Sequence, residues 1–109
     1  MMMGSPLTPE VAHEHYLKVP VCITDDYIIK FEQHISGTFV HCDVFQWNKT
    51  IKEKLQKSWD SVTANHGGPI YALHDFHDRK HQKFLQLFGF KRLKSLPGLK
   101  EIWIWSNNG

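Results

Sequence analysis

The stretch PIYALHDFHDRKHQKFLQLFGF, residues 69–90, decides how the rest of the chain is interpreted. Its first part, residues 69–76, reads as more buried than alternating, which predicts a strand. Asp78 is a suitable N-cap for a helix over residues 79–88, and Gly89 suits the left-handed position that ends a helix. We therefore expect a strand followed directly by a helix. The inner face of this helix is expected to carry His81, Phe84, Leu87 and Phe88.

The segment before this unit predicts an antiparallel hairpin. Residues 27–35 alternate as a strand with one buried face does, and residues 38–45 form a second candidate strand. The two-residue turn at residues 36–37 contains a glycine and favours a hairpin. The residues expected on the buried face of the first strand are Tyr27, Ile29, Phe31, Gln33 and Ile35.

The N-terminal residues predict less regular structure. Residues 1–7 are expected to be a disordered lead-in. A short helix is expected over residues 8–18, with Thr8 as its N-cap and Pro20 just beyond its end. Residues 22–24 are a candidate strand fragment.

A longer helix is expected over residues 51–64. Thr50 and Glu53 have the spacing of a capping box, and Asn48 is the alternative N-cap. The helix should end at residues 65–68, where Asn and Gly tolerate the left-handed conformation. Its apolar face is expected to consist of Ile51, Leu55, Trp59 and Val62.

Residues 91–96 and 99–105 predict a final pair of strands around a Pro-Gly turn. The resulting order is helix, strand, strand, helix, strand, helix, strand, strand, without regular strand-helix-strand alternation. We therefore expect an α+β fold, a mixed and mostly antiparallel sheet with helices packed on it, in a single domain over residues 8–106.

Composition narrows the function classes. The chain has 109 residues and a formal net charge of +2, which is too mild a charge to favour nucleic-acid binding. No apolar run reaches the roughly 18 residues that a membrane span needs, and no secretory signal follows Met1, so a cytoplasmic protein is expected. Cys22 and Cys42 are expected to be free thiols.

Histidines near the end of the predicted strand suggest two kinds of site. His74, His77 and His81, with Asp75 and Asp78, have spacings that would place metal ligands on one face of a helix. The expected strand over residues 69–76 separates His74 from the helix, so no metal is expected. His74 or Asp75, at the end of that strand, is instead a candidate general base.

Residues 78–90, DRKHQKFLQLFGF, open on Asp78 and close on Gly89 and Phe90. This segment is similar to a helix of the GNAT N-acetyltransferases, which opens on Asn and closes with Phe-Tyr-x-x-x-Gly-Phe. Asp78 stands at the Asn position and Phe84 at the Phe position. The resemblance covers roughly residues 27–106. It implies a reduced version of the acyl-CoA N-acyltransferase fold.

Two positions depart from that family's pattern. The family binds the pyrophosphate of acetyl-CoA with a glycine-rich loop before a helix, whereas residues 45–51, FQWNKTI, contain no glycine. Leu85 stands where the family often has a Tyr general acid, and leucine cannot donate a proton.

The resemblance implies two alternative functions. The first is an acetyl-CoA-dependent N-acetyltransferase, with the cofactor between strands 38–45 and 69–76. Its cofactor-binding residues would be Asn48, Lys49, Thr50 and Asp78, and its base His74 or Asp75. The second is a non-catalytic protein of the same fold. Compact members of this kind resemble proteins of tailed bacteriophages, which implies a virion or assembly component, or a binder of a host protein, located in the host cytoplasm or the virion.

Clustered aromatic residues suggest a partner surface. Trp103 and Trp105 lie on the last expected strand, and Phe45 and Trp47 follow another. An exposed aromatic edge at these positions would suit self-association or docking on a larger assembly.

Overall fold

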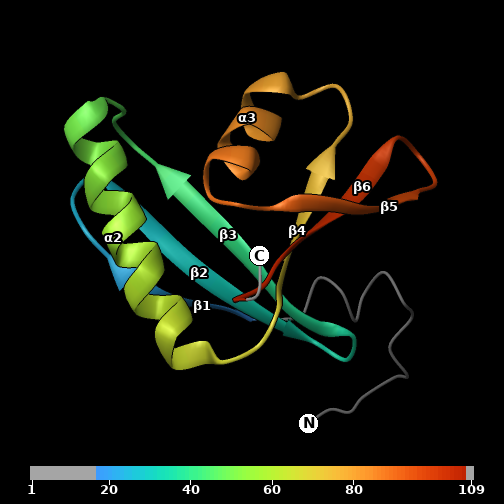
Figure 1. Ribbon diagram of the computed structural model, residues 1–109, viewed down its shortest axis with the longest axis horizontal. Coiled ribbons are helices and arrows are strands. Elements are labelled where there is room, and N and C mark those ends of the chain that lie inside the picture. Colours follow the sequence, from blue (N-terminus) through green and yellow to red (C-terminus); the bar gives the residue numbers. More distant parts are fainter. Residues whose placement is uncertain (1–16, 108–109) are drawn as a thin grey trace, which may run out of the picture.

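A computed structural model describes residues 17–107 of the protein. It contains one six-stranded sheet with the strand order β1-β2-β3-β4-β6-β5, and two helices (Figure 1). This confirms the α+β class with a mixed, mostly antiparallel sheet. The elements are β1 (Lys18–Ile23), β2 (Tyr27–His34), β3 (Gly37–Val44), α2 (Lys49–His66), β4 (Ile70–Asp75), α3 (Arg79–Leu87), β5 (Lys91–Leu96) and β6 (Lys100–Trp105).

The N-terminal part of the chain differs from the expectation. The helix expected over residues 8–18 lies almost wholly outside the described residues, but Lys18 begins a strand and does not end a helix. Pro20 lies within β1, at the irregularity between Pro20 and Cys22. A proline is compatible with this position because proline occurs in edge strands and at bulges, and β1 is an edge strand with an irregularity here.

Strands β2 and β3 form the predicted hairpin. Their register runs from Tyr27 opposite Val44 to His34 opposite Gly37. The turn therefore consists of Ile35 and Ser36, one residue earlier than predicted, and Gly37 is the first residue of β3.

The parallel pairing of β3 with β4 is short. It joins only Thr38 with Ile70 and Phe39 with Tyr71, after which the two strands diverge (Figure 1). On its other side β4 pairs with β6 along its whole length, from Ile70 opposite Trp105 to Asp75 opposite Lys100. The sheet is therefore continuous at one end of β3 and β4 and open at the other.

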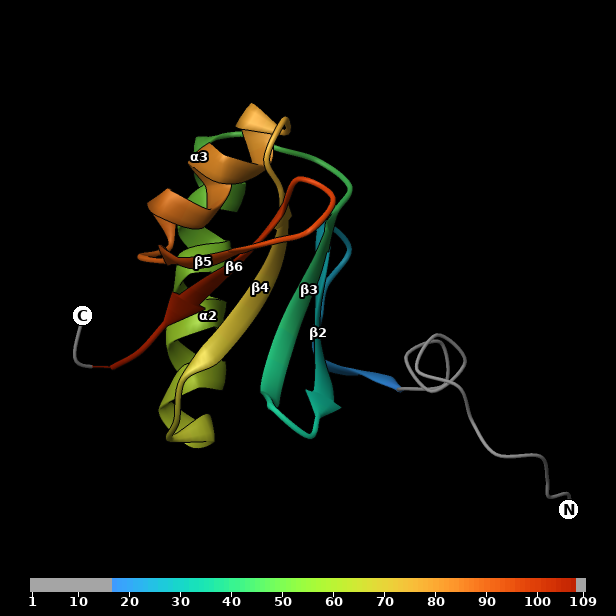
Figure 2. The same ribbon diagram turned by 90° about the vertical axis from the view of Figure 1, so that its right-hand side faces the viewer.

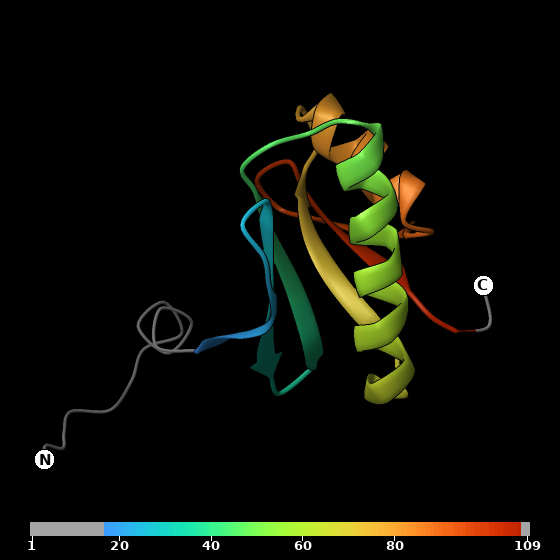
Figure 3. The same ribbon diagram turned by 90° about the vertical axis from the view of Figure 1, so that its left-hand side faces the viewer.

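Both helices lie on the same side of the sheet, as the two side views show (Figures 2 and 3). The core fills the space between them and the sheet. Strand β4 alternates here, with Leu73 exposed, and does not have two buried faces. The buried apolar residues are Tyr27, Ile29, Ile51, Leu55, Trp59, Ile70, Ala72, Leu85, Phe88, Phe90 and Trp103.

Helix α3 is rotated relative to the prediction. Leu85 is 3% exposed and belongs to the core, whereas Leu87 is 38% exposed. His81, Leu85 and Phe88 follow one another at intervals of four and three residues, which is one face of a helix. Phe84 packs partly against the core from the side.

Helix α2 begins two residues earlier than predicted, at Lys49. Its N-cap is Asn48, whose side-chain oxygen accepts a hydrogen bond from the Ile51 amide at 2.9 Å. The alternative cap is thus the correct one, and the expected capping box of Thr50 with Glu53 is wrong. Gly67 ends the helix at φ 77°, as predicted.

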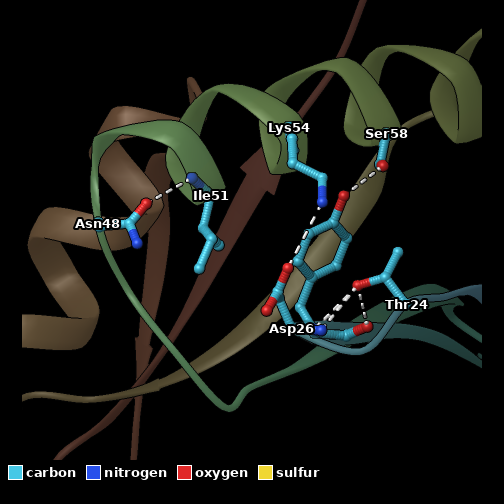
Figure 4. Close-up of polar contacts among 7 residues, drawn as sticks. Thr24, Asp26, Asn48, Ile51, Lys54 and Ser58 are labelled. Atoms are coloured by element: carbon cyan, nitrogen blue, oxygen red, sulfur yellow. Dashed lines mark hydrogen bonds and ion pairs between the residues drawn. The ribbon is translucent and has the colours of Figure 1, made fainter.

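Polar contacts join α2 to the start of β2. Ser58 bonds the Tyr27 hydroxyl at 2.7 Å, and Lys54 reaches Asp26 at 3.5 Å (Figure 4). Thr24 closes the β1–β2 turn by accepting bonds from the amides of Asp26 and Tyr27. These contacts fix the helix over the half of the sheet that contains β2 and β3.

The opposite face of the sheet contains a buried carboxylate. Tyr27 and Ile29 are buried as predicted, but Gln33 and Ile35 are exposed, and Glu32 on the other face is only 2% exposed. Glu32 is covered because two imidazoles bond its carboxylate: His41 at 2.5 Å and His34 at 3.0 Å. In the described part of the chain, no helix is long and apolar enough to cross a membrane.

Candidate functional site

A cavity of about 680 Å³ lies where β3 and β4 separate. Its walls come from β3 between Val40 and Val44, from Ala72 and Leu73 of β4, and from the inward face of α3. Leu55 and Trp59 of α2 also line it. A volume of a few hundred to about 1,000 Å³ is typical of small-molecule and cofactor sites. The divergence of two neighbouring strands therefore creates a ligand-sized space within the sheet.

The cavity wall is largely apolar with a few polar groups. Leu85 and Phe88 of α3 contribute apolar surface. Asp78, Lys80 and His81, all at the beginning of α3, contribute the polar groups of that helix. Such a lining suits a ligand with a slender, partly apolar body and a polar or charged end.

His81 reaches the cavity and is bonded to His74. The Nδ1 atoms of the two residues are 2.8 Å apart, and their ring centroids are 5.0 Å apart. His74 is 1% exposed and lies beneath His81, so it is not itself among the residues that line the cavity. Burial lowers the pKa of His81, and His74 lowers it further, against an opposing effect of Asp78.

Asp75, the other candidate base, lies on the opposite face of β4. It is exposed, and it accepts hydrogen bonds from the His77 amide at 3.0 Å and from Lys100 at 3.3 Å. The bond from the His77 amide is the main cause that lowers the pKa of Asp75, and Lys100 adds to it. Successive strand residues point to opposite faces, which is why His74 is buried under α3 and Asp75 is not.

The residues expected to bind the cofactor fall into two places. Asp78 lies in the cavity wall, where its side chain caps α3 by accepting a bond from the His81 amide at 3.0 Å. Asn48, Lys49 and Thr50 are exposed at the beginning of α2 and are not among the cavity-lining residues.

Trp47 precedes α2 in the chain and packs against a residue of the cavity wall. Its ring centroid is 5.8 Å from that of Phe84, and Phe84 lines the cavity. Residues 45–51, which contain no glycine, thus pack an indole against α3.

Cys42 also lines the cavity, and its thiol is half-buried there. Burial, with a smaller contribution from Asp43, raises the pKa of Cys42 to about 12. A thiol with this pKa carries almost no thiolate near neutral pH. This raised pKa argues against a covalent cysteine intermediate at Cys42.

Sequence reasoning missed the cluster of Glu32, His34 and His41. A signal was present, because Glu32 and His34 are two residues apart in a strand and so share a face. His41 joins them only through the β2–β3 register, which the sequence leaves open by one residue. Within residues 17–107, no group of three or more His, Cys, Asp or Glu residues is arranged to hold a metal ion.

The fold places the chain in a known class. The sheet has one short parallel pairing, a helix follows each of the two diverging strands, and an antiparallel hairpin ends it. This is the GNAT-type acyl-CoA N-acyltransferase fold, as the resemblance implied. One solved structure that shares it is the GNAT domain of S. lividans PAT, with a TM-score of 0.59 and 12% sequence identity. The similarity covers 73% of this chain and 53% of that one, so the chain spans about half of its length.

Sequence comparison adds no relative to this structural similarity. No protein-family model matches the chain, and a search of curated proteins gives no match. At 12% identity the structural similarity shows the fold alone.

Proposed function

We propose that the protein binds an acyl-coenzyme A in the cavity between β3 and β4 and transfers the acyl group to an amine. The observation that carries this proposal is the separation of β3 from β4 after Phe39 and Tyr71, with a cavity of about 680 Å³ in the gap. It is supported by the GNAT-type fold. The acetyl group is a small acyl group and the first to test.

The divergence of the strands supports a ligand with amide groups. Among residues 17–107, β3 has no ladder partner on its β4 side beyond Phe39, and β4 has none on its β3 side beyond Tyr71. Backbone N–H and C=O groups left in this way need other partners. The pantetheine arm of coenzyme A has two amides on a slender chain, so it can both fill the gap and bond to the strand edges.

The phosphate end of the ligand is proposed to lie towards the beginning of α2. The side chain of Asn48 satisfies the Ile51 amide, which leaves the first amides of the helix, at Lys49 and Thr50, to face an anion. Lys80, in the cavity wall, supplies a further positive charge on the α3 side. Asp78 would act here as the cap that fixes α3.

The chemistry requires a neutral amine beside the thioester. The amine nitrogen attacks the thioester carbon, a C–N bond forms, and the C–S bond breaks to release the thiolate of coenzyme A. A base must remove a proton from the ammonium form of the acceptor. Of the two candidates, His74 lies next to the cavity and contacts it through His81, whereas Asp75 lies on the other face of β4.

Thermal unfolding with acetyl-CoA tests the binding step. A ligand that binds only the folded protein raises the melting temperature, and at 100 times its Kd it adds about 2.7 kcal/mol of stability. Lys49→Ala combined with Thr50→Ala should weaken this effect. Lys57→Ala, on the exposed side of the same helix, is the matched control that should not. An unchanged melting temperature at millimolar acetyl-CoA would contradict the proposal.

A non-catalytic role is the second candidate, and the observations that favour it are Leu85 and Trp47. Leu85 is buried in the cavity wall where a proton donor would stand, and Trp47 packs where the phosphate loop would be open. Such a protein would act through a partner, as the resemblance to phage proteins implies. Val19 and Ile23, exposed on the edge strand β1, are the surface for it. Acetyl-CoA binding without transfer to any amine would favour this role.

A further inference from the structure

We propose that His81 is the catalytic residue that moves protons in the cavity, and that His74 is the residue that positions it. This assignment rests on the proposed acyl transfer. His81 lies on the inner face of α3, one turn before Leu85, and unlike Leu85 it can accept and donate a proton.

The position of His81 is the first support. His81 and Leu85 are four residues apart on α3, and both line the cavity. Residues at this spacing lie on the same face, about 6 Å apart along the helix axis. A ligand that extends along the α3 wall past Leu85 therefore also passes His81.

The bond to His74 is the second support. Because the Nδ1 atoms of His74 and His81 are bonded to each other at 2.8 Å, the nitrogen of His81 that is left for a ligand is Nε2. One of the two Nδ1 atoms carries the shared proton. When His74 donates it, Nε2 of His81 is protonated in the neutral pair; when His81 donates it, Nε2 is a base. The same pair can therefore accept a proton and return it.

His74 is held rigidly enough to position its neighbour. It is 1% exposed, and its ring meets that of Trp103 at 5.5 Å and 75°. Trp103 in turn donates its indole N–H to Glu101 at 3.0 Å, and Arg92 bonds the same carboxylate at 3.3 Å. A fixed imidazole under a half-buried one is the arrangement in which one histidine orients another.

The surroundings of His81 favour a neutral imidazole at neutral pH. Burial lowers its pKa, and His74 on β4 lowers it further. The other titratable or charged groups along the cavity are Asp78 and Lys80 on α3 and His41, Cys42 and Asp43 on β3. Of these, Asp78 opposes the decrease.

Two protons leave the acceptor ammonium during the proposed transfer. Nε2 of His81 takes one proton from the acceptor ammonium, and the resulting amine attacks the thioester carbon. The tetrahedral intermediate loses its second N–H proton to water as the C–S bond breaks. The imidazolium of His81 then gives its proton to the thiolate of coenzyme A. One amide, one thiol and one released proton result, and His81 returns to its neutral form.

Two measurements on the full-length protein test the assignment. In the first, ¹⁵N-histidine spectra are recorded with and without acetyl-CoA, and the Nε2 resonance of His81 should shift while that of the exposed His77 should not. In the second, thiol release from acetyl-CoA is followed with spermidine and with a lysine-containing peptide. His81→Gln should lower kcat by about 100-fold or more, the usual contribution of an acid–base group, with little change in the KM for acetyl-CoA.

Matched variants separate catalysis from structure. His77→Gln replaces a neighbouring exposed histidine and should leave turnover and melting temperature unchanged. His74→Leu removes the bond to His81 and its charge, so the acid limb of the pH–rate profile should move to higher pH. His74→Asn, whose amide stands near the position of Nδ1, keeps a bond to His81 but not the charge, so its acid limb should lie between those of His74→Leu and the wild type. His81→Asn provides a second replacement if His81→Gln unfolds.

Each outcome decides one statement. Wild-type turnover in folded His81→Gln, or acetyl-CoA binding without a shift at His81, overturns the assignment to His81 while the proposed function stands. An unchanged pH profile in folded His74→Leu overturns the positioning role. If acetyl-CoA does not bind, or if it binds but releases no thiol with either acceptor amine, the proposed transfer is overturned and the assignment of His81 with it.

Discussion

Gly37 lies so close to the ring of Tyr71 that a Cβ atom on Gly37 would be 2.6 Å from the Cε2 atom of Tyr71. Gly37 opens β3, and Tyr71 is one of the two residues through which β4 pairs with it. The ring of Tyr71 also packs against Phe39 at 5.6 Å. The short seam between the two halves of the sheet therefore requires a residue without a side chain at its beginning.

Gly37→Ala should destabilise the protein more than Gly67→Ala. At Gly37 the backbone has φ 145° and the new methyl group would collide with Tyr71, whereas at Gly67, with φ 77°, nothing lies within 4 Å. Backbone strain costs about 1–3 kcal/mol at such positions. Overpacking adds about 1–3 kcal/mol at Gly37 only. Urea unfolding of both variants measures the difference, and equal losses would show that Tyr71 moves aside freely.

Asn48→Ala and Thr50→Ala distinguish the two caps that the sequence allowed for α2. Asn48 bonds the Ile51 amide at 2.9 Å, so its replacement should cost about 1 kcal/mol, the usual value for an N-cap. Thr50 is exposed within the helix, and its replacement should change the unfolding free energy by less than about 0.5 kcal/mol. The reverse order in denaturant unfolding would support the capping box.

His41→Leu should destabilise the protein through Glu32. The Glu32 side chain is 3% exposed and bonded by His41, so the variant leaves a buried carboxylate with one partner fewer, at a cost of about 1–3 kcal/mol. The ion pair of Lys30 with Asp43 on the same strands is the control, because their side chains are 29% and 51% exposed. Lys30→Ala should cost less than about 1 kcal/mol. A double-mutant cycle of Glu32 with His41 then isolates their coupling energy.

The unfolding free energy should fall with acidification in two steps. The pKa of His81 is lower in the folded protein than its ordinary value of 6.5, so the unfolded chain binds the proton more readily and stability decreases as the pH falls below 6.5. For Glu32, burial raises the pKa, but the bond from His41 and the charges of His41 and His34 outweigh it and the pKa is lowered overall. Its contribution is present above 4.5 and is lost as the pH falls below that value.

His81→Gln is the variant that separates these two steps. It should abolish the decrease that begins near pH 6.5 and leave the decrease below pH 4.5. Urea midpoints measured from pH 8 to pH 3 for the wild type and the variant give the difference directly. A variant whose midpoints follow those of the wild type over the upper range would show that another group causes the first step.

Local sequence patterns were sufficient to predict most of the fold. Asp78 caps α3 and Gly67 ends α2 as predicted, because each acts on neighbours within one turn. The terminal strands β5 and β6 pair around Pro97 and Gly98 for the same reason. The errors occur where distant residues decide. Glu32 is buried because His41 approaches from the next strand, and Leu85 is turned inward because it joins the core cluster together with Phe88.

The candidate site was predictable in part. Asp78 lies in the cavity wall because the N-cap of α3 follows directly from β4. The alternation of a strand already implied that His74 and Asp75 point to opposite faces. The pairing of His74 with His81 was not predictable, because it depends on the angle at which α3 returns over the sheet. The position of Trp47 against Phe84 depends on the same angle.

The brief pairing of β3 with β4 also determines where hydrogen exchange is fast. Central strands of a sheet are usually among the most slowly exchanging parts of a protein. Successive amides of a strand point to alternate edges, so every second amide of β3 between Val40 and Val44 faces the gap and not a ladder partner. These amides should exchange readily while their immediate neighbours, bonded to β2, exchange slowly. The gap between β3 and β4 thus exposes backbone amides in the middle of the sheet to water. A ligand bound there would slow exchange at alternate residues of β3.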